Sequence, residues 1–347
     1  MSEPQHVVGL SGGKDSTAVA CLAIEWMEKR GRDRSEILFL FADTGNEDQI
    51  THDHIAYLGR KMRIDIRTVR ADFSDRFAAR RAALPEDWRK EKRRTKHRHG
   101  CLKKDCDCPV RISPPVSEER IAQALATLHP TGNPFLDICM LKGRFPSRRA
   151  QFCTEELKVV PINQVLHPIL ERGQSIIQWM GERAEESPPR AKKPVIHRVR
   201  HEKAAQVFYR PVHKLSALQC FEISKRHGLA PNPLYKMNMS RVGCLFCVNC
   251  AKGEIVQGAQ RLPHNVERIA RWEEIVTKCS RRGAATFFPA PMIPGDPSDE
   301  TRAGIRKAVD WAKTSRGGRQ YDLLQAAWRD EADEQGAMCE SAYGLCE

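Results

Sequence analysis

Residues 6–17 read His6-Val7-Val8-Gly9-Leu10-Ser11-Gly12-Gly13-Lys14-Asp15-Ser16-Thr17, and the organisation expected for the whole chain follows from them. The apolar run at the start of this stretch is bounded by glycine, which is typical of a buried strand. A helical pattern of apolar residues begins at Ser16 or Thr17 and continues to about Lys29. The stretch therefore predicts a strand, a tight loop and a helix.

The Ser-Gly-Gly-Lys loop between that strand and that helix has the composition of a phosphate site. Gly12 and Gly13 let the backbone approach a ligand closely, and the loop amides and the helix N-terminus favour an anion. Lys14 adds a positive charge, and Ser11 and Ser16 add hydroxyl donors. The spacing does not fit a Walker loop, which has Ser or Thr directly after the lysine. A glycine-rich turn that binds nothing is the alternative interpretation.

Two further strands are expected downstream of the loop. Residues 37–41 are an apolar run, residues 64–69 have the pattern of a third strand, and the intervening residues 48–61 have a helical pattern. Alternating strands and helices predict a doubly wound parallel sheet with right-handed crossovers. Asp43 directly follows the second strand, and the carboxyl ends of parallel strands are where such sheets bind ligands.

The pattern breaks between residues 72 and 115, and we interpret this segment as an insertion. A basic run at 89–99 leads into Cys101, Cys106 and Cys108. The run is either a solvated loop or a contact for nucleic acid. The three cysteines, with His97 or His99, are a candidate zinc site, although their spacing fits no standard zinc finger.

The rest of the chain is predicted to continue the α/β pattern and then to become helical. Helices are expected at 117–128, 214–227, 266–280, 299–314 and 321–335, a strand at 175–180, and a basic loop at 192–203. We expect two regions: residues 1–212 form a nucleotide-binding α/β domain with the insertion, and residues 213–347 form a cysteine-containing, helical C-terminal region.

Composition restricts the class of partner and the compartment. The chain has 347 residues, 41% of them hydrophobic, and a formal net charge of +13. This charge favours nucleic acid or nucleotides as partners, although a basic surface that serves only solubility is the alternative. The sequence has neither a secretion signal nor an apolar run of membrane-spanning length, which predicts a cytoplasmic protein without membrane contact. Thirteen cysteines in a reducing compartment indicate metal or thiol chemistry.

Cys244, Cys247 and Cys250 form the second strong motif. Thiolates spaced C-x2-C-x2-C converge on one site, and the run is more typical of iron–sulfur ligation than of zinc. No fourth cysteine follows immediately, so a fourth ligand must come from elsewhere in the chain or one iron stays open. A structural zinc site and three unliganded buried cysteines are the alternatives.

The string Ser11-Gly12-Gly13-Lys14-Asp15-Ser16 resembles the PP-loop of the ATP pyrophosphatase superfamily, whose fold is adenine nucleotide alpha-hydrolase-like. Two later segments resemble motifs of the phosphoadenosine phosphosulfate (PAPS) reductase-like family. The first, Arg149-Ala-Gln-Phe-Cys153-Thr154-Glu-Glu-Leu157-Lys158…Pro161, is similar to the family's R-x-C-T-x-x-L-K…P segment. The second, at 181–190, is similar to the family's G-x-R-x-x-E-S motif. The first of these segments contains Cys153, which is our candidate fourth ligand of a [4Fe-4S] cluster.

The chain departs from true PAPS reductases, which have a degenerate PP-loop and a C-terminal Glu-Cys-Gly motif. Here the loop is intact, and the chain ends with Cys339 and Cys346 in another context. In this respect the sequence is similar to the ATP pyrophosphatases of DNA phosphorothioation systems, which act in phage defence. It is also similar to phage and prophage proteins of the PAPS reductase family.

The resemblance implies a role for each loop residue. Ser11, Gly12, Gly13, Lys14 and Ser16 would hold the phosphates of ATP. The carboxylates that would hold Mg2+ are Asp15 and Asp43. The cations that would pair with an anionic substrate are Arg183 and Arg190, and their alternative is ion pairing with Glu182, Glu185 or Glu186.

The implied reaction is cleavage of ATP to AMP and pyrophosphate, with sulfur displacing the adenylated oxygen. Cys346 or Cys339 would carry the sulfur as a persulfide, unless both are ordinary tail cysteines. The substrate would be nucleic acid, with DNA as the first candidate, and a cysteine desulfurase or a thioredoxin-like protein would be the partner. The alternatives are a thioredoxin-dependent sulfonucleotide reductase and a non-catalytic nucleotide- or DNA-binding module.

Overall fold

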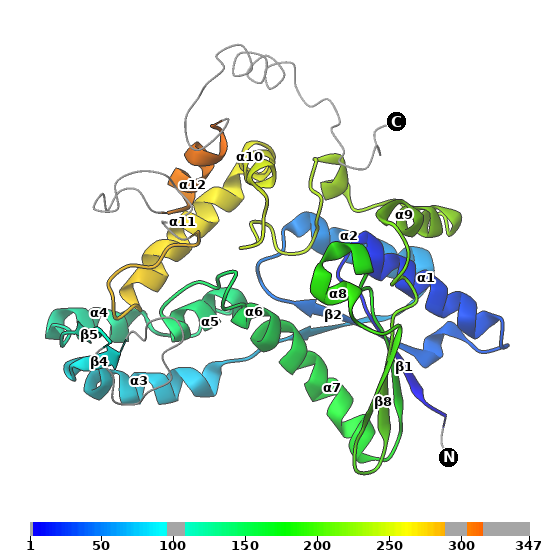
Figure 1. Ribbon diagram of the computed structural model, residues 1–347, viewed down its shortest axis with the longest axis horizontal. Helices are drawn as coiled ribbons and strands as arrows, with labels where there is room; N and C mark the ends of the chain where they lie inside the picture. The colour runs from blue at the N-terminus through cyan, green and yellow to red at the C-terminus, as the bar shows by residue number, and fades with distance from the viewer. Residues whose placement is uncertain (1–2, 96–107, 289–303, 315–347) are drawn as a thin grey trace.

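The computed structural model describes residues 3–95, 108–288 and 304–314 (Figure 1). Its centre is a six-stranded sheet with the strand order β3-β2-β1-β6-β8-β7. All neighbouring pairs are parallel except β8 and β7, which form an antiparallel hairpin at one edge. The strands are β1 (Gln5–Gly9), β2 (Ile37–Asp43), β3 (Ile66–Arg70), β6 (Ile176–Trp179), β7 (Ile196–Arg200) and β8 (Ala205–Tyr209).

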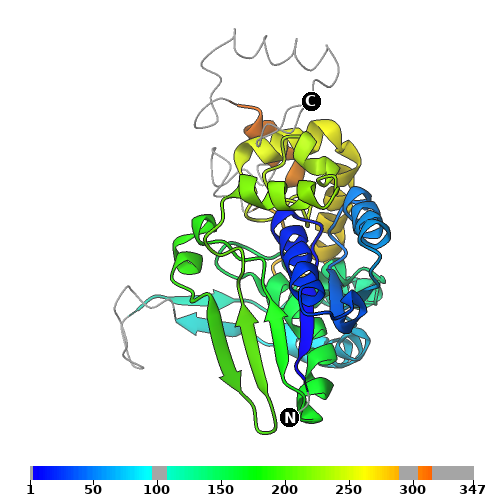
Figure 2. The same ribbon diagram turned by 90° about the vertical axis from the view of Figure 1, so that its right-hand side faces the viewer.

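Helices cover both faces of this sheet, because consecutive side chains of each strand point to opposite faces. Val8 and Phe39 pack against one layer of helices, and Val7 and Leu40 pack against the other. The first layer contains α1 (Lys14–Glu28), α2 (Gln49–Met62) and α9 (Ala217–Arg226), and the second contains α7 (Val160–Glu171). The predicted doubly wound α/β fold is therefore confirmed (Figure 2).

The strand order reverses at β1, and this places the site. The chain builds β2 and β3 on one side of β1 and returns to β6 on the other side. In open α/β sheets, ligands bind outside the carboxyl ends of the strands at such a switch point. The predicted phosphate loop follows β1 directly, so it lies at that position.

Part of the segment 72–115, which the sequence analysis interprets as an insertion, packs in the hydrophobic core. Residues 74–89 form helix α3 (Ser74–Arg89), and its Phe77, Leu84 and Trp88 are fully buried in the largest hydrophobic cluster. The spacing of these three side chains places them on one helical face, but Pro85 and the many charges obscure the periodicity in the sequence. The start of the basic run lies on the hairpin of β4 (Lys92–Thr95) and β5 (Val110–Ser113).

The candidate zinc site in this segment lies mostly outside the described residues. Cys101, Cys106, His97 and His99 all fall there, and Cys108, where the description resumes, is buried. The same holds for the helix expected at 321–335 and for Cys339 and Cys346.

The prediction of a loop at 192–203 is wrong, because residues 196–200 form the edge strand β7. Ile196 and Val199 supply the β-branched residues of a strand, and the arginines tolerate this place because an edge strand faces solvent. Pro194 precedes the strand, where its missing N–H costs no ladder hydrogen bond.

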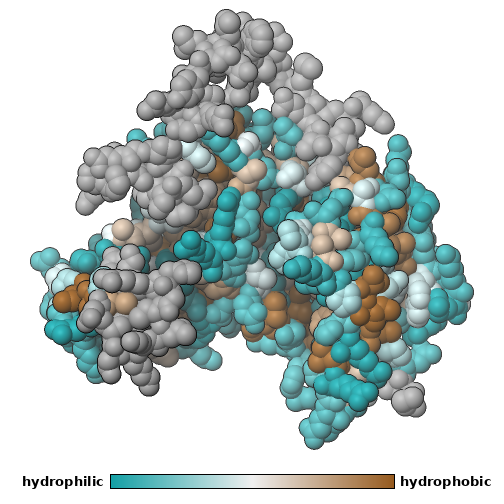
Figure 3. All heavy atoms as spheres, viewed as in Figure 1, coloured by the Kyte–Doolittle hydropathy of each residue, from teal (hydrophilic) through white to brown (hydrophobic). Residues whose placement is uncertain are grey.

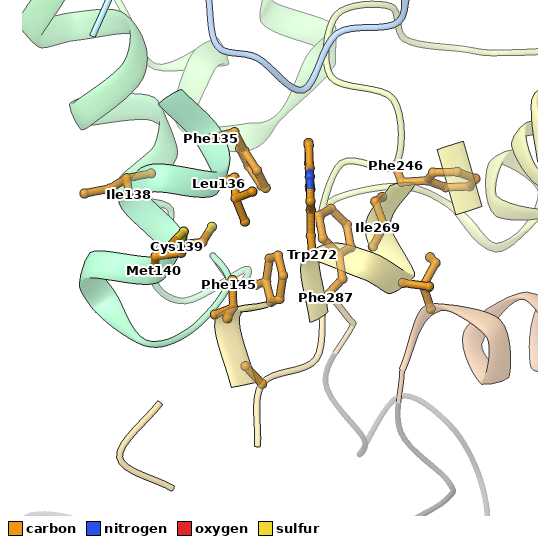
Figure 4. Packing of buried hydrophobic residues seen from close by; sticks show 14 of the residues in the cluster. Phe135, Leu136, Ile138, Cys139, Met140, Phe145, Phe246, Ile269, Trp272 and Phe287 are labelled. Atoms are coloured by element: carbon orange, nitrogen blue, oxygen red, sulfur yellow. The ribbon is translucent and has the colours of Figure 1, made fainter. Parts of the chain in front are cut away.

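A second, helical core lies beside the sheet (Figure 1). Within it the Phe135 and Trp272 rings stack at 5.6 Å, and the Phe145 and Phe287 rings lie 5.4 Å apart (Figure 4). The cluster joins residues 73–157 to residues 234–312. Its further helices are α4 (Glu118–Thr127), α5 (Pro134–Lys142), α10 (Lys252–Arg261), α11 (Pro263–Lys278) and α12 (Ile305–Ala312).

Short helical turns connect these elements. They are η1 (Arg34–Glu36), α6 (Phe152–Thr154), the π-helical turn η2 (Glu155–Val159), η3 (Ala184–Glu186), α8 (Pro188–Ala191) and η4 (Pro233–Lys236). The division of the chain at residue 212 stays a prediction, and so does the cytoplasmic location. None of the helices described here has the length and apolar character needed to cross a bilayer.

Candidate functional site

The phosphate loop has the backbone geometry that the sequence predicts. Gly12 has a φ of +73°, which L side chains rarely adopt, and Gly13 caps helix α1 without any side-chain acceptor. The Ser11 N–H donates to Ser16 Oγ at 3.1 Å, and the Ser16 hydroxyl donates to the Gly13 carbonyl at 3.0 Å. A helix that starts without a side-chain cap leaves its first N–H groups to an anion.

A distant turn fixes this loop in place. The Lys14 N–H donates to the Tyr235 hydroxyl at 3.0 Å, and the Asn232 side-chain amide donates to the Gly12 carbonyl at 3.2 Å. Lys14 Nζ also lies 5.4 Å from the centre of the Tyr235 ring. The sequence marks residues 231–235 only as a turn, so the role of these two side chains was not predictable from it.

Asp15 and Arg183 contact each other directly. Arg183 Nε lies 2.6 Å from Asp15 Oδ1, and Lys14 Nζ lies 3.6 Å from Asp15 Oδ2. Arg183 is only 4% exposed and also pairs with Glu185. The G-x-R segment therefore lies against the phosphate loop. The proposed tasks of Asp15 in binding Mg2+ and of Arg183 in binding substrate stay predictions.

Arg190 forms an ion pair with Glu186. Burial disfavours the Glu186 carboxylate, but the Arg183 N–H at 3.0 Å and the Arg190 guanidinium outweigh this and hold the pKa of Glu186 below its ordinary value. In this structure both arginines therefore pair with neighbouring glutamates, which was the alternative interpretation. Arg190 nevertheless lines the central cavity.

Asp43 has two neighbours that the sequence analysis did not identify. Ligand atoms of Asp43, Glu47 and His52 all lie within 4.8 Å of one another. Glu47 is 5% exposed and accepts hydrogen bonds from the Thr44 N–H and hydroxyl at 3.0 and 2.8 Å. Carboxylate oxygens and an imidazole nitrogen are suitable ligands for a divalent cation. The signal in the sequence was the second acidic residue, four positions after Asp43.

The loop after β2 also holds the cysteine segment. The Leu245 N–H donates to the Asn46 carbonyl at 3.0 Å, and Glu47 and Cys244 form an isolated antiparallel bridge. Cys244 Sγ lies 3.5 Å from Thr44 Oγ1 and 3.8 Å from Glu47 Oε1. The residues that follow the second strand therefore touch both the cation group and the first cysteine of the motif.

Electrostatic interactions connect the four candidate ligand cysteines. Burial raises the pKa of the Cys244 thiol to about 12, and the negative charge of Glu47 acts in the same direction. Burial also raises the pKa of Cys153, with a further contribution from Cys247, and the pKa of Cys250, with contributions from Glu254 and Cys247. The charge of Cys247 therefore acts on Cys153, and the assignment of Cys153 as the fourth ligand stays a prediction.

Lys158 stands among these thiols. Its pKa is raised mainly by the charge of Cys244, with smaller contributions from Glu47 and Cys153, against the effect of burial. Lys158 lies in the π-helical turn η2, which directly follows the short helix α6 that contains Cys153. The sequence motif contains this lysine, but only the structure indicates that it faces the cysteines.

A single cavity of about 440 Å³ joins the two halves of the site. The phosphate loop lines it from one side, and Cys244, Cys247 and Cys250 line it from the other. The cations on its wall include Lys14, Lys158, Arg190 and Arg241. A pocket of this size holds a nucleotide-sized ligand, so a bound nucleotide would meet both the loop and the thiols.

The geometry defines an α/β protein in which a glycine-rich loop and a cysteine motif line one cavity, and sequence comparisons identify the family. The model of the phosphoadenosine phosphosulfate reductase domain matches residues 5–250. The chain belongs to this family, as its motifs predicted. Family membership supports a sulfonucleotide-related or adenylyl-transfer activity.

Two individual proteins illustrate the relationship. An uncharacterized 37.8 kDa protein of Escherichia phage 186, from the gpa 5′ region, is 39% identical over 350 residues, which covers 99% of this chain and 96% of the phage protein. The solved structure of PAPS reductase from Candida auris, in complex with phosphate, covers 71% of this chain and 84% of its own, with 13% identity and a TM-score of 0.36.

Gly181 provides a test of how closely the G-x-R segment approaches the phosphate loop. A Cβ at Gly181 would lie 3.1 Å from the backbone of both Asp15 and Ser16. We expect Gly181→Ala to lower the free energy of unfolding by about 1–3 kcal/mol, as overpacking does, and to weaken ATP binding at least tenfold. Chemical denaturation and calorimetric titration with ATP measure the two effects.

Gly59→Ala is the matched control, because its Cβ would make only ordinary contacts at 3.5 Å or more in helix α2. It should retain the ATP affinity of the parent protein and be at least as stable, because alanine is favoured over glycine inside a helix. Equal behaviour of the two variants would contradict the close approach of Gly181 to the loop.

Proposed function

We propose that the protein cleaves ATP to AMP and pyrophosphate and uses the adenylated intermediate for sulfur transfer. The observation that carries this proposal is the shared cavity, which is lined by an intact Ser-Gly-Gly-Lys-Asp-Ser loop and by three cysteines of one motif. A nucleotide bound at the loop would have its α-phosphate in the same space as a sulfur nucleophile. Proximity of this kind is itself a large part of catalysis.

The loop and the cation group would share the work of phosphate binding. The N–H groups that follow Lys14 in the first turn of α1, and the Lys14 ammonium, would hold the β- and γ-phosphates, while the Lys14 N–H donates to Tyr235. Asp43 and Glu47, with His52 beside them, offer three candidate ligands for Mg2+ in one place, although Asp43 also pairs with Arg70 at 3.3 Å. Asp15 pairs with Arg183 and Lys14. A bound Mg2+ would neutralise the charge that develops on pyrophosphate as it leaves.

The spacing of the cysteine motif favours an iron–sulfur cluster over zinc. The run C-x2-C-x2-C is more typical of iron–sulfur ligation, whereas zinc usually takes two separated pairs of ligands. Cys244, Cys247 and Cys250 line one cavity, and Cys153 is the proposed fourth ligand. They would hold a [4Fe-4S] cluster, which supplies either redox chemistry or a scaffold.

The proposed reaction converts an adenylated acceptor into a thiolated one. An acceptor oxygen attacks the α-phosphorus of ATP, and pyrophosphate leaves. The terminal sulfur of a persulfide on Cys346 then displaces AMP, which gives an acceptor joined to Cys346 by a disulfide. A second thiol, for which Cys339 is the candidate, attacks the cysteine sulfur and releases the thiolated acceptor. A cysteine desulfurase would supply the persulfide sulfur, and a thioredoxin-like protein would reduce the final disulfide.

We further propose that the acceptor is nucleic acid, with DNA as the first candidate. Strand β7 carries Arg198 and Arg200 at alternate positions, both exposed and without an ion pair among the described residues. Hydrophilic side chains gather at the lower end of the molecule, where Figure 1 places the β7–β8 hairpin (Figure 3). The strand begins near the cavity wall. Arg210 donates hydrogen bonds to the Pro194 carbonyl, just before the strand, and to Glu182, which lines the cavity.

A sulfonucleotide reductase is the second candidate, and the family match favours it. It would use the same cavity and cysteines with thioredoxin, but would leave ATP intact. A non-catalytic nucleotide- or DNA-binding module is the third candidate, and it would bind ATP without turnover.

The first test is the fate of ATP. We expect anaerobic protein with Mg2+ and ATP labelled at the α- and γ-phosphates to release AMP and pyrophosphate, with stimulation by DNA. Lys14→Ala should lose at least 100-fold in rate, because it removes the cation at the phosphates. Lys61→Ala, on the exposed end of α2, should leave the rate unchanged. Intact ATP together with reduction of PAPS would establish the reductase instead, and binding without turnover would establish a binding module.

The second test is the metal content. We expect anaerobically purified protein to contain about four irons per chain and to absorb visible light through thiolate-bound iron. Serine substitution of Cys153, Cys244, Cys247 or Cys250 should remove most of the iron and the colour. Cys279→Ala is the control, since Cys279 is buried at the end of α11 away from the cavity lining. A colourless protein with one zinc per chain would refute the cluster.

The third test concerns nucleic acid. Charge reversal of Arg198 and Arg200 to Glu should weaken binding to duplex DNA and reduce the slope of log affinity against log salt by about 2, since each lost phosphate contact removes about 0.9. The same reversal of Arg60 and Lys61, which are exposed on α2 near the opposite edge strand, should have little effect. Equal losses in both variants would indicate nonspecific attraction by net charge.

A further inference from the structure

A tight turn of the chain carries two arginines at its corner, in the segment that connects α5 to α6. The Ser147 N–H donates to the Ala150 carbonyl at 3.2 Å, and the Ala150 N–H donates to the Ser147 carbonyl at 3.0 Å. These two bonds close a two-residue turn, so Arg148 and Arg149 occupy its corner positions. Both arginine side chains are exposed.

Contacts with the cysteine motif hold this turn beside the thiol centre. The Arg148 guanidinium donates to the Val248 and Cys250 carbonyls at 3.4 and 3.5 Å. The Gln151 side-chain amide donates to the Asn249 side-chain oxygen at 3.5 Å. Since Cys250 also lines the proposed nucleotide cavity, a ligand bound at the turn would lie next to the wall of that cavity.

The turn and its flanks carry positive charge that neighbouring carboxylates leave largely uncompensated. Residues 142–151 contain three arginines and one lysine and no acidic residue. The lysine pairs with Glu156. In the part of the chain that the structure describes, the guanidinium groups of Arg144, Arg148 and Arg149 have no carboxylate partner, because those of Arg148 meet only neutral carbonyls. Three positive charges therefore face an anionic partner.

An aromatic ring beside these charges indicates the class of that anion. The Phe152 ring is half-exposed, and the guanidinium carbon of Arg144 lies 5.7 Å from its centre. Guanidinium groups bind phosphates in a bidentate manner, and unpaired bases stack on aromatic rings and on guanidinium planes. Cations interleaved with an aromatic ring are typical of sites for single-stranded nucleic acid. An acidic protein surface would match the charges but would leave the ring without a partner.

The size of the nucleotide cavity favours an unpaired strand over a duplex. The cavity has a volume of about 440 Å³, which suits one nucleotide-sized ligand. A base-paired segment is too wide to enter such a space, so enzymes that act inside a pocket take single strands or extrude one nucleotide. Only a strand that is unpaired at this point can bring an acceptor group to the thiols.

We propose that Arg144, Arg148 and Arg149 bind the phosphodiester backbone of an unpaired nucleic-acid strand at its entry to the cysteine centre. A base of that strand stacks on Phe152. This inference rests on the proposed function, to which it adds the class of substrate and the place where the substrate enters. It also gives the two basic surfaces different tasks, because the exposed arginines of β7 are the proposed contacts for duplex DNA.

Fluorescence anisotropy with a labelled single strand of about 12 nucleotides tests the proposal. The triple variant Arg144→Gln, Arg148→Gln and Arg149→Gln should bind this strand at least tenfold more weakly than the parent protein. Its slope of log affinity against log salt should fall by about 2, since each phosphate contact with a single strand contributes about 0.7. For the same strand paired to its complement, the loss of affinity should be about threefold or less.

The matched control removes three charges elsewhere. The triple variant Arg60→Gln, Lys61→Gln and Arg67→Gln changes exposed residues of α2 and β3 and should bind the single strand like the parent protein. Thermal melting verifies that both variants fold. Equal losses in the two variants would overturn the site, and an equal loss for the duplex would overturn the preference for an unpaired strand.

A second measurement leaves the arginines in place. A photoreactive p-benzoylphenylalanine that replaces Gln151 should crosslink the labelled strand, whereas the same group in place of Leu218, which is exposed on α9, should not. Absence of a crosslink from position 151 would overturn the site. Displacement of the strand by polyglutamate as effectively as by unlabelled strand would indicate an acidic protein surface as the partner and would overturn the assignment of nucleic acid.

The two proposals fail in different ways. Lys14→Ala should lose ATP turnover and keep the binding of the single strand. A protein that cleaves ATP but binds the strand equally well with and without the three arginines would refute only this site. Binding of the strand at the turn by a protein that leaves ATP intact would refute only the proposed reaction.

Discussion

The contact between the loop after β2 and the cysteine segment is the constraint on which the site depends. One backbone hydrogen bond, from the Leu245 N–H to the Asn46 carbonyl, and the bridge between Glu47 and Cys244 join parts of the chain that are about 200 residues apart. A single hydrogen bond contributes only about 0.5–1.5 kcal/mol. Its effect here is positional, since it brings the thiols to the carboxyl edge of the sheet, where the phosphate loop already lies.

Neighbouring buried groups make this junction rigid. Asp48 is 3% exposed, and although burial disfavours its charge, the Ile50 N–H and the Asn265 amide lower its pKa below the ordinary value. Arg268 reaches from α11 to the Glu47 carbonyl at 3.3 Å and to the Asn46 side chain at 3.4 Å. The helical region is thereby attached to the sheet through polar contacts that a small displacement would leave unsatisfied.

The sequence predicted most of the sheet and the phosphate loop. Runs of apolar residues in a strand and the Ser-Gly-Gly-Lys motif can each be recognised from a few consecutive residues. It did not predict Tyr235, Asn232 or Glu47, whose roles depend on contacts between distant segments. Helix α3 was missed because charged residues surround its three buried side chains. Strand β7 was missed because an edge strand can be almost as polar as a loop.

Glu47 connects the two chemistries most directly. Its carboxylate belongs to the candidate cation group with Asp43, and its negative charge also raises the pKa of Cys244 and of Lys158. A divalent cation at Asp43 and Glu47 would offset that charge, so the thiolate form of Cys244 would become more favourable once the cation is bound. The proposed phosphate side and the proposed sulfur side of the cavity thus share one buried carboxylate.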